Sequence, residues 1–326
     1  REENPDAPAC QTLLRITLMP YRHLFGPVPS RRLGISLGVD LVPQKTCTYN
    51  CVYCECGKTT DLTCERREYV PTGRVIAELD AYLATAPDLD YVTFAGSGEP
   101  TLHSGIGEII AFVKDRYPRY RVAVLTGSAL LPDPAVRAAL MRADLVVPSL
   151  DAVSEEVFQA LNRPHQGLTA GRVLAGLIAF VREYPGEVRL EVFIVPGIND
   201  TDEEVRRLRD AVAAINPDRV QVNTLDRPGT DIRVRAASPR TLERVAGMLG
   251  GEVIGAAPDE SAMVPEAREV TDTLLATLRR RPSTVADLAR TSGLRPAEVT
   301  KYLRVLEEKG VVKPVREKRG VFYRAT

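Results

Sequence analysis

The chain has 326 residues, no net formal charge, 44% hydrophobic residues and 26% charged residues, which is an ordinary composition for a globular protein. This length exceeds the usual size of one domain, so two domains are expected, and no apolar run approaches the roughly 18 residues needed to span a bilayer. Six cysteines in so long a chain do not fit a small secreted scaffold held by disulfides, and the cytoplasm is the expected location.

Residues 1–18 are expected to be an N-terminal extension that is not native to the first domain. Met19 stands directly before YRHLFGPVPSRRLG, and the segment QTLLRITLMP is too short, and too interrupted by Arg15, for the apolar region of a signal peptide.

Residues 19–255 alternate short β-branched runs with amphipathic segments. The helix expected over 169–184, for example, repeats apolar residues at helical spacing. Near-continuous apolar strands between such helices indicate parallel strands buried on both faces. The expected strands cover 35–42, 91–96, 121–127, 144–150, 189–197 and 218–225. Six βα units are fewer than the eight of a closed barrel, so the prediction is an α/β fold, a partial (β/α)6 TIM-like barrel with its ligand at the carboxyl ends of the strands.

Residues 256–264 read as a linker, and residues 265–326 as a winged helix-turn-helix domain. A first helix runs through Leu274 and Leu278, and further helices are expected over 284–291 and 296–309 with a turn at Gly293. Two short strands around Gly320 would form the wing.

Four cysteines lie within ten positions in KTCTYNCVYCECG, directly after the first expected strand. The spacing Cys47-x3-Cys51-x2-Cys54 offers three thiolates, which are ligands for iron or zinc. Structural zinc usually has four protein ligands, and the sequence has neither a second CxxC nor a nearby histidine. Three sulfurs suit a 4Fe–4S cluster whose fourth iron is left for another ligand, although a zinc site or free thiols remain alternatives.

The CTYNCVYC stretch resembles the CxxxCxxC signature of the radical S-adenosylmethionine (SAM) superfamily. The resemblance implies a partial barrel in which Cys47, Cys51 and Cys54 hold the cluster and SAM chelates the free iron. It further implies reductive cleavage of SAM to a 5′-deoxyadenosyl radical that abstracts a substrate hydrogen, and a low-potential electron donor such as a flavodoxin or ferredoxin.

The same resemblance implies the residues that contact SAM. GSGEP resembles the GGEP motif of the family; its glycines permit close backbone approach and its glutamate supplies an acceptor for the SAM ammonium, although Ser97 departs from the family pattern. Tyr53 is expected against adenine, whereas Ser149 and Asp151 are expected at the ribose. The full expected set is Tyr53, Gly96, Ser97, Gly98, Glu99, Thr126, Ser149, Asp151, Asn199 and Asn223.

Residues 20–255 further resemble a subgroup of uncharacterised Fe–S oxidoreductases grouped with the wybutosine-synthesis radical SAM proteins. This resemblance names no substrate, and no catalytic side chain is assigned. Arg31, Arg32, Cys56 and His103 are candidates for substrate contact. For Cys56, ligation of a second cluster, a redox role and an inert loop position all remain open.

The tail segment 265–326 carries 14 Lys and Arg against 8 Asp and Glu, whereas the rest of the chain is acidic. This asymmetry favours a polyanionic partner. The expected nucleic-acid contacts are Lys301, Arg304, Arg316, Lys318 and Arg319. Winged helices also dock proteins, so a protein partner remains an alternative.

Three functions follow from these patterns. The first is a radical SAM oxidoreductase or transferase acting on RNA that the tail grips. The second is the same chemistry on a protein or small metabolite, with the tail as a docking module. The third is a DNA-binding regulator in which the barrel senses the cluster or SAM.

Overall fold

The computed structural model describes residues 21–30, 32–226, 229–231, 233–254, 267–294, 296–317 and 319–326. The expectations of an N-terminal extension and of a linker over 256–264 fall outside these residues. No helix in the described ranges combines the length and the apolar character needed to cross a membrane.

A single sheet of eight strands forms the main body, in the order β1-β2-β5-β6-β7-β8-β9-β10. Seven of them are mutually parallel, and six of these correspond to the six strands expected from the sequence: β2 (Gly34–Val39), β5 (Tyr91–Phe94), β6 (Arg121–Thr126), β7 (Leu145–Pro148), β8 (Glu187–Phe193) and β9 (Arg219–Asn223). The parallel α/β architecture is therefore confirmed.

Two edge strands were not expected from the sequence. β1 (Leu24–Ser30) pairs antiparallel with β2 and contains Pro27 and Pro29, whereas β10 (Glu252–Val253) is only two residues long. Proline lowers strand propensity and lacks a ladder donor, which is why the pattern around β1 reads as a loop, yet proline is tolerated on an edge strand.

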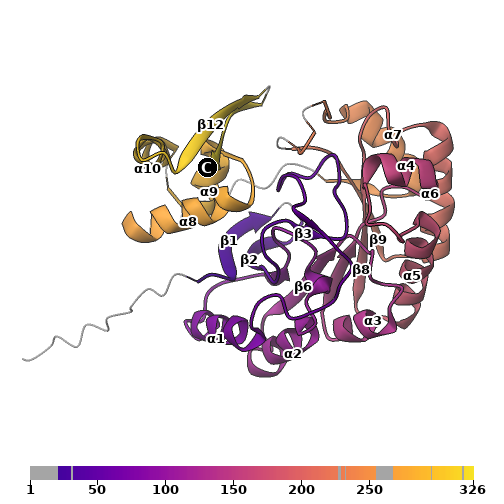
Figure 1. The fold of residues 1–326 in the computed structure, drawn as a ribbon, viewed down its shortest axis with the longest axis horizontal. Coiled ribbons are helices and arrows are strands. Elements are labelled where there is room, and N and C mark those ends of the chain that lie inside the picture. The colour runs from indigo at the N-terminus through magenta and orange to yellow at the C-terminus, as the bar shows by residue number, and fades with distance from the viewer. Residues whose placement is uncertain are drawn as a thin grey trace, which may run out of the picture.

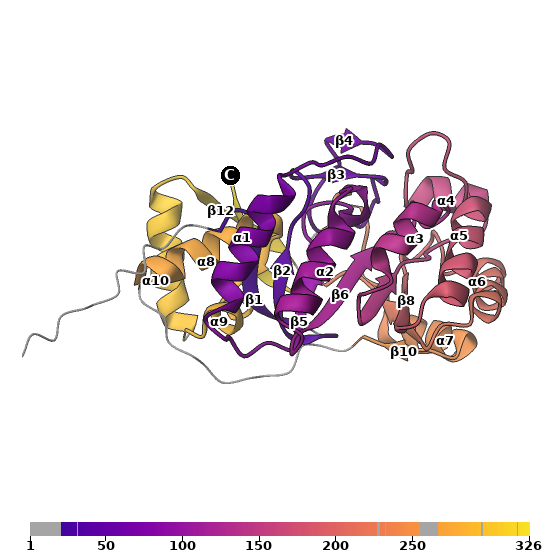
Figure 2. The same ribbon diagram turned by 90° about the horizontal axis from the view of Figure 1, so that it is seen from below.

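Helices follow most of the strands and lie along the outer side of the curved sheet (Figure 1), an arrangement that Figure 2 shows from below. They are α1 (Thr72–Leu83), α2 (Ile106–Arg116), α3 (Pro134–Leu140), α4 (Glu155–Leu161), α5 (Ala170–Glu183), α6 (Asp202–Ile215) and α7 (Pro239–Leu249), with a 3-10 turn η1 at Pro100–Leu102. Side-chain caps set the starts of α3, α5, α6 and α7: Thr169 accepts a hydrogen bond from Arg172 N before α5, for example.

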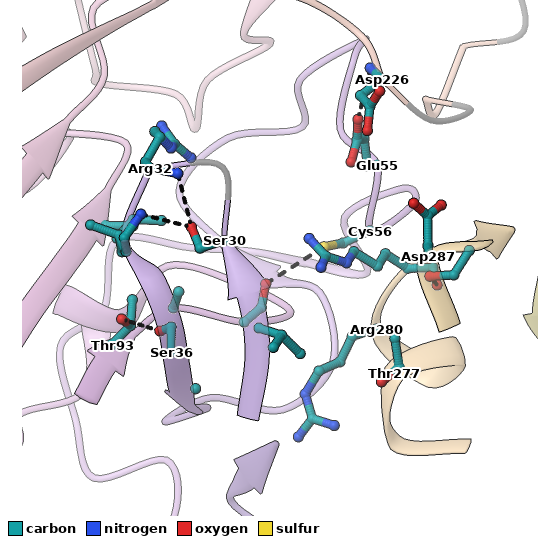
Figure 3. Close-up of a pocket in the computed structure, with 18 of the residues that line it drawn as sticks. Ser30, Arg32, Ser36, Glu55, Cys56, Thr93, Asp226, Thr277, Arg280 and Asp287 are labelled. Atoms are coloured by element: carbon teal, nitrogen blue, oxygen red, sulfur yellow. Dashed lines mark hydrogen bonds between the residues drawn. The ribbon is translucent and has the colours of Figure 1, made fainter. Parts of the chain in front are cut away.

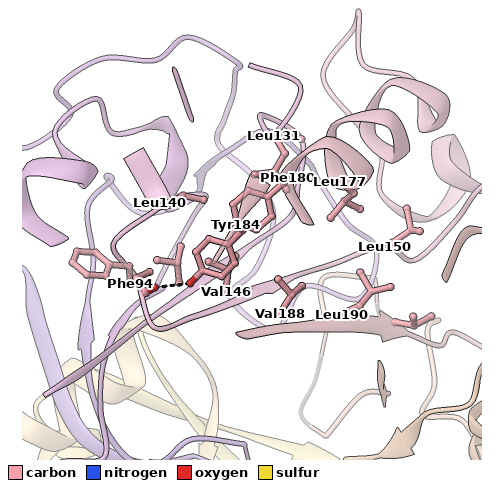
Figure 4. Close-up of a cluster of buried hydrophobic side chains, with 14 of the residues drawn as sticks. Phe94, Leu131, Leu140, Val146, Leu150, Leu177, Phe180, Tyr184, Val188 and Leu190 are labelled. Carbon is pink, nitrogen blue, oxygen red and sulfur yellow. Dashed lines mark hydrogen bonds between the residues drawn. The ribbon is translucent and has the colours of Figure 1, made fainter. Parts of the chain in front are cut away.

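The main core lies between these helices and the sheet. Figure 4 shows part of it, where Phe180 and Leu177 of α5 meet Val146 of β7 and Leu190 of β8, all fully buried. The Tyr184 hydroxyl donates to the Ala143 carbonyl at 2.6 Å, so the polar group of this ring is satisfied inside the core.

Residues 267–326, called the tail below, form three helices and a three-stranded antiparallel sheet. The elements are α8 (Ala267–Arg280), β11 (Ser283–Thr284), α9 (Val285–Ser292), α10 (Pro296–Glu308), β12 (Val312–Glu317) and β13 (Gly320–Ala325). They enclose a separate apolar core that includes Leu274, Leu288, Leu303 and Phe322. Gly293 ends α9 with a φ of 68°, a left-handed conformation that suits glycine.

The tail packs against the main body beside β1, as both ribbon views show (Figures 1 and 2). α8 and α9 contact β1, and Gln44 Nε2 donates to the Arg279 carbonyl at 3.1 Å. The helices thereby cover the β1 edge of the sheet, which would otherwise present unpaired backbone groups.

Candidate metal and cofactor site

The cysteine loop follows β2 of the eight-stranded sheet. It begins with β3 (Thr46–Cys47), which forms a separate two-stranded sheet with the short β4 (Asp61–Leu62). Backbone bonds anchor its middle: Val52 N donates to Leu161 O at 3.0 Å and Asn50 N to Asn162 O at 3.0 Å. The three motif cysteines are therefore fixed on one loop between β2 and α1.

Two of the motif sulfurs accept hydrogen bonds from polar side chains. Lys45 Nζ lies 3.0 Å from Cys54 Sγ, and Asn162 Nδ2 lies 3.5 Å from Cys51 Sγ. A hydrogen bond from the Cys56 thiol, together with the nearby Lys45 ammonium, lowers the pKa of Cys54 to about 5. Burial raises the pKa of Cys47 to about 12, so the thiols of this loop differ strongly in acidity.

This donor set fits an iron–sulfur cluster in kind and in number. No three His, Cys, Asp or Glu side chains in the described part of the chain are already grouped as a metal site. Nevertheless three thiols share one anchored loop, and a buried lysine ammonium stands beside one of them, where it would stabilise an anionic metal–thiolate centre. Metal binding displaces thiol protons, so the high pKa of Cys47 does not prevent ligation.

The GSGEP loop follows β5 and packs directly on the cysteine loop. Glu99 N donates to Thr46 O at 3.1 Å, and Lys45 N to Ser97 O at 3.0 Å. A Cβ at Gly98 would lie 1.9 Å from the Thr46 carbonyl oxygen, so only glycine permits this approach. The two motifs therefore form one continuous surface.

The carboxylate of Glu99 is buried and fully engaged by the chain. It accepts from Thr101 N at 3.0 Å, from Thr101 Oγ1 at 2.6 Å, from Thr126 Oγ1 at 2.8 Å and from Gly127 N at 2.8 Å. Receiving the SAM ammonium, the role expected for Glu99, would require this carboxylate to exchange partners. The hydroxyl of Thr126 is likewise committed to Glu99.

Tyr53 stacks on Phe193 with ring centroids 3.9 Å apart, and its hydroxyl donates to Asp151 at 2.5 Å. Asp151 also accepts from Asn162 Nδ2 and from Phe193 N, both at 2.9 Å, and burial raises the pKa of Asp151 to about 6. Asn199 is fully buried and bonds the carbonyls of Asp151 and Phe193. These residues hold Tyr53 in place.

The two residues expected at the ribose differ in their surroundings. Ser149 lies just past β7, where its carbonyl accepts from Ser128 Oγ at 2.8 Å. Asp151 is enclosed behind Tyr53. The ribose role of both residues stays a prediction.

A cavity of about 410 Å³ extends from the cysteine loop into the concave side of the sheet. Of the residues expected at SAM or substrate, Tyr53, Cys56, Gly96, Asn223 and Arg32 line it, as does Cys54. Asn223 Nδ2 donates to Glu191 Oε1 at 2.8 Å, and Arg32 Nη1 lies 2.8 Å from the same oxygen. Figure 3 shows Arg32 on the main-body side and Thr277, Arg280 and Asp287 on the tail side.

His103, a further substrate candidate, lies away from the cavity. His103 is fully buried, its Nε2 lies 2.8 Å from Val70 O, and its Nδ1 accepts from Gly105 N. It is not part of the cavity lining, so the expectation of a substrate contact there is corrected: the ring holds the turn before α2. Arg31 lies outside the described residues.

The structure describes the side chains of only two of the five expected nucleic-acid contacts, Arg316 and Arg319. The side chains of Lys301 and Arg304, and residue Lys318, lie outside the described part of the chain. Arg316 is exposed on β12. Arg319 turns toward the main body instead, where it pairs with Asp226 and lies 3.3 Å from Asp287 Oδ1.

Several residues of this site were missed by the sequence analysis. Lys45 and Asp40 both precede the cysteine motif without belonging to it, and Arg280 comes from the C-terminal part of the chain. The sequence offered two signals for these residues: the three consecutive arginines at 279–281, at the end of α8, and Lys45, two positions before Cys47. Neither pattern says which surface the tail faces.

Comparison with known proteins identifies the family of this chain. The family model for the Radical SAM superfamily matches residues 41–212. A UPF0026 protein of Methanocaldococcus jannaschii is 33% identical over 233 residues, which cover 71% of this chain and 72% of that protein.

A Brachyspira hyodysenteriae protein named GTPase Obg is 33% identical over 296 residues, 90% of this chain but only 43% of that protein, so this chain spans less than half of that relative. Among solved structures, a radical SAM methyltransferase from Sphaerobacter thermophilus aligns with a TM-score of 0.53 at 19% identity. The alignment covers 67% of this chain and 66% of that chain, and it shows the fold alone.

Proposed function

Since this chain belongs to the radical SAM superfamily, whose members are enzymes, and groups with the UPF0026 proteins, we propose that Cys47, Cys51 and Cys54 hold a 4Fe–4S cluster. In this superfamily the cluster and SAM together supply a 5′-deoxyadenosyl radical that abstracts hydrogen from a substrate. A reductant such as a flavodoxin or ferredoxin would provide the electron. The observation that carries the proposal is the single surface formed by the cysteine loop and the GSGEP loop.

The chain's own residues would bind and orient the reactants at this surface. We propose a partial barrel for the main body, with SAM along the carboxyl ends of β5 to β9, where Tyr53, Gly96 to Glu99, Thr126, Ser149, Asp151, Asn199 and Asn223 lie. Tyr53 is held by Phe193 and Asp151, so its ring is preorganised for a stacking contact. Lys45 would neutralise charge at Cys54.

The test is cluster assembly followed by SAM cleavage. Anaerobic reconstitution of the full chain should load about four irons, and dithionite with SAM should then release 5′-deoxyadenosine and methionine. Cys51→Ala should lose both the iron and the cleavage, because it removes one of three protein ligands.

Cys64→Ala is the matched control, since this thiol lies outside the motif, and it should keep both properties. About eight irons in the wild-type chain would instead indicate a second cluster. A fully loaded cluster that never cleaves SAM would contradict the proposed enzyme and favour a sensor.

The geometry favours a small substrate over a polymer. The cavity beside Cys54 and Cys56 has a volume of about 410 Å³, and SAM would occupy part of it, since Tyr53, Gly96 and Asn223 line it too, which leaves room for a small molecule. We propose a winged-helix fold for the tail, with nucleic acid as its alternative partner through Arg316. Nucleic-acid binding would have to weaken steeply with salt and depend on that exposed arginine.

A further inference from the structure

The cavity beside the cysteine loop has two walls from distant parts of the chain. The main body contributes inward-facing residues of β1, β2, β5, β6, β8 and β9. The tail contributes residues of α8 and α9 together with Arg319. Figure 3 shows both walls facing the same space, with Cys56 between them.

Contacts at both ends of the tail wall hold it against the main body. Arg280 Nε lies 3.5 Å from Asp40 Oδ2, and the Arg280 guanidinium lies over the Phe25 ring at 4.3 Å. At the other end, Arg319 Nη1 donates to the Asp226 carbonyl at 2.6 Å. The tail therefore closes the β1 side of the cavity.

The cavity is lined by several guanidinium groups. Five arginines line it against four carboxylates: Arg32, Arg280, Arg281, Arg290 and Arg319 face Glu55, Glu191, Asp226 and Asp287. Several of these groups pair with one another, as Arg290 does with Asp287 at 2.6 Å. Pairing within the walls leaves a cavity that is charged but close to balanced.

Two arginines, one in each wall, pair with a single carboxylate without a well-aligned hydrogen bond. Arg32 Nη1 lies 2.8 Å from Glu191 Oε1, and Arg280 Nε lies 3.5 Å from Asp40 Oδ2. A guanidinium has five donors, so one poorly aligned carboxylate leaves donor capacity for a further acceptor. A ligand that brings an oxyanion would use this capacity.

We propose that the tail forms one wall of a substrate site, and that this site takes a small molecule bearing a carboxylate or a phosphate, bound between Arg32 and Arg280. Guanidinium groups bind both anions through paired hydrogen bonds. A cavity of about 410 Å³ accommodates a metabolite but not a folded macromolecule. The identification of this ligand as the substrate rests on the proposed function; the anion site itself does not.

The test titrates inorganic phosphate and succinate separately into the full chain at constant ionic strength, with calorimetry and the unfolding midpoint as readouts. At least one anion should bind the wild-type chain, and the anion that binds identifies the headgroup. Arg32→Gln and Arg280→Gln should each weaken that binding roughly tenfold or more, because each removes a charged hydrogen-bond donor. Arg324→Gln, an exposed arginine of the same tail that is not an expected nucleic-acid contact, should bind as the wild type does.

If Arg280→Gln fails to fold, Arg281→Gln at the same end of the tail wall replaces it. Absence of binding by both anions, or binding unaffected by the cavity variants, would overturn the proposal. Loss in Arg32→Gln alone would remove the tail from the site. Displacement of phosphate by a short single-stranded RNA, lost in Arg316→Gln, would assign the anion site to nucleic acid.

The two proposals fail separately. SAM cleavage without anion binding would leave the enzyme and remove the anion site. Anion binding with the expected variant pattern, but no SAM cleavage from a loaded cluster, would keep the site and remove the proposed reaction.

Discussion

Asp40 is the residue through which the tail meets the GSGEP loop. It accepts from Ser97 N at 3.3 Å and from Ser97 Oγ at 2.9 Å, and it forms the ion pair with Arg280. Gly96, with a φ of 148°, packs against it so closely that a Cβ would lie 2.5 Å from Asp40 Cγ. Ser97 is the residue that departs from the family motif. Its partner Asp40 also pairs with Arg280, so Asp40 links the GSGEP loop to the tail.

Arg280→Gln should destabilise the protein by on the order of 3 kcal/mol, because it leaves the buried Asp40 carboxylate without its cation. Burial already raises the pKa of Asp40, and Arg280 opposes that rise. A folded pKa above the unfolded one makes stability fall as pH rises between the two values.

Loss of Arg280 raises the Asp40 pKa further, so the deficit of the variant should be larger near pH 8 than near pH 5. Denaturant unfolding of wild type, Arg280→Gln and the exposed Arg316→Gln at the two pH values measures this effect. An equal deficit at both values would mean that Asp40 does not depend on the arginine.

The sequence predicted the residues of this site that form contiguous motifs and missed those that meet only through folding. Cys47, Cys51 and Cys54 are recognisable because three ligands of a cluster fit one short loop. Asp40 and Arg280 each read as ordinary charged residues, since nothing local to either one specifies the other. Glu99 was recognised, but its four donors were not, because two of them come from the end of β6, which is distant in the sequence.

At the scale of elements, α9 depends on an acidic residue with two roles. Asp287 closes the capping box, accepting from Thr284 N at 3.1 Å and from Thr284 Oγ1 at 2.8 Å, while its other oxygen contacts Arg290 and Arg319. The start of this helix and the tail wall of the cavity therefore share one carboxylate.

Thr284→Ala should cost about 1 kcal/mol of tail stability, because it removes only the cap. Asp287→Ala should cost clearly more, because Asp287 is buried and its loss also removes the carboxylate paired with Arg290 and one of the two that pair with Arg319. Thermal unfolding of both variants, followed by circular dichroism, compares them. Equal losses would show that the arginine contacts add nothing to the cap.

β1 shows why the edge of the sheet was harder to predict than its centre. The central strands are continuous apolar runs, and these are readable from sequence. β1 carries Gly26, Pro27 and Pro29, and it is a strand only because β2 pairs with it and the tail covers it. Its strand character comes from tertiary contacts, which no local pattern records.

At the scale of the molecule, two cores meet at one edge strand. The main core and the tail core are separate clusters of buried residues. Among the described residues, the contact between them includes α8 and α9 against β1, together with polar contacts from Gln44, Arg280 and Arg319. The length and the charge asymmetry predicted two parts but not that they would share a cavity.

Because Arg280 and Arg319 anchor the two ends of the tail wall to the main body, loss of both arginines should release the tail without unfolding either core. In Arg280→Gln/Arg319→Gln, amide hydrogen exchange should rise in β1 and along α8 and α9, while β6 and β7 at the centre of the sheet keep wild-type protection. Exchange followed by mass spectrometry measures each segment, and Arg316→Gln should match the wild type throughout. A rise that included β6 and β7 would mean that the two cores unfold together, and unchanged exchange in β1 would mean that apolar packing alone holds the tail in place.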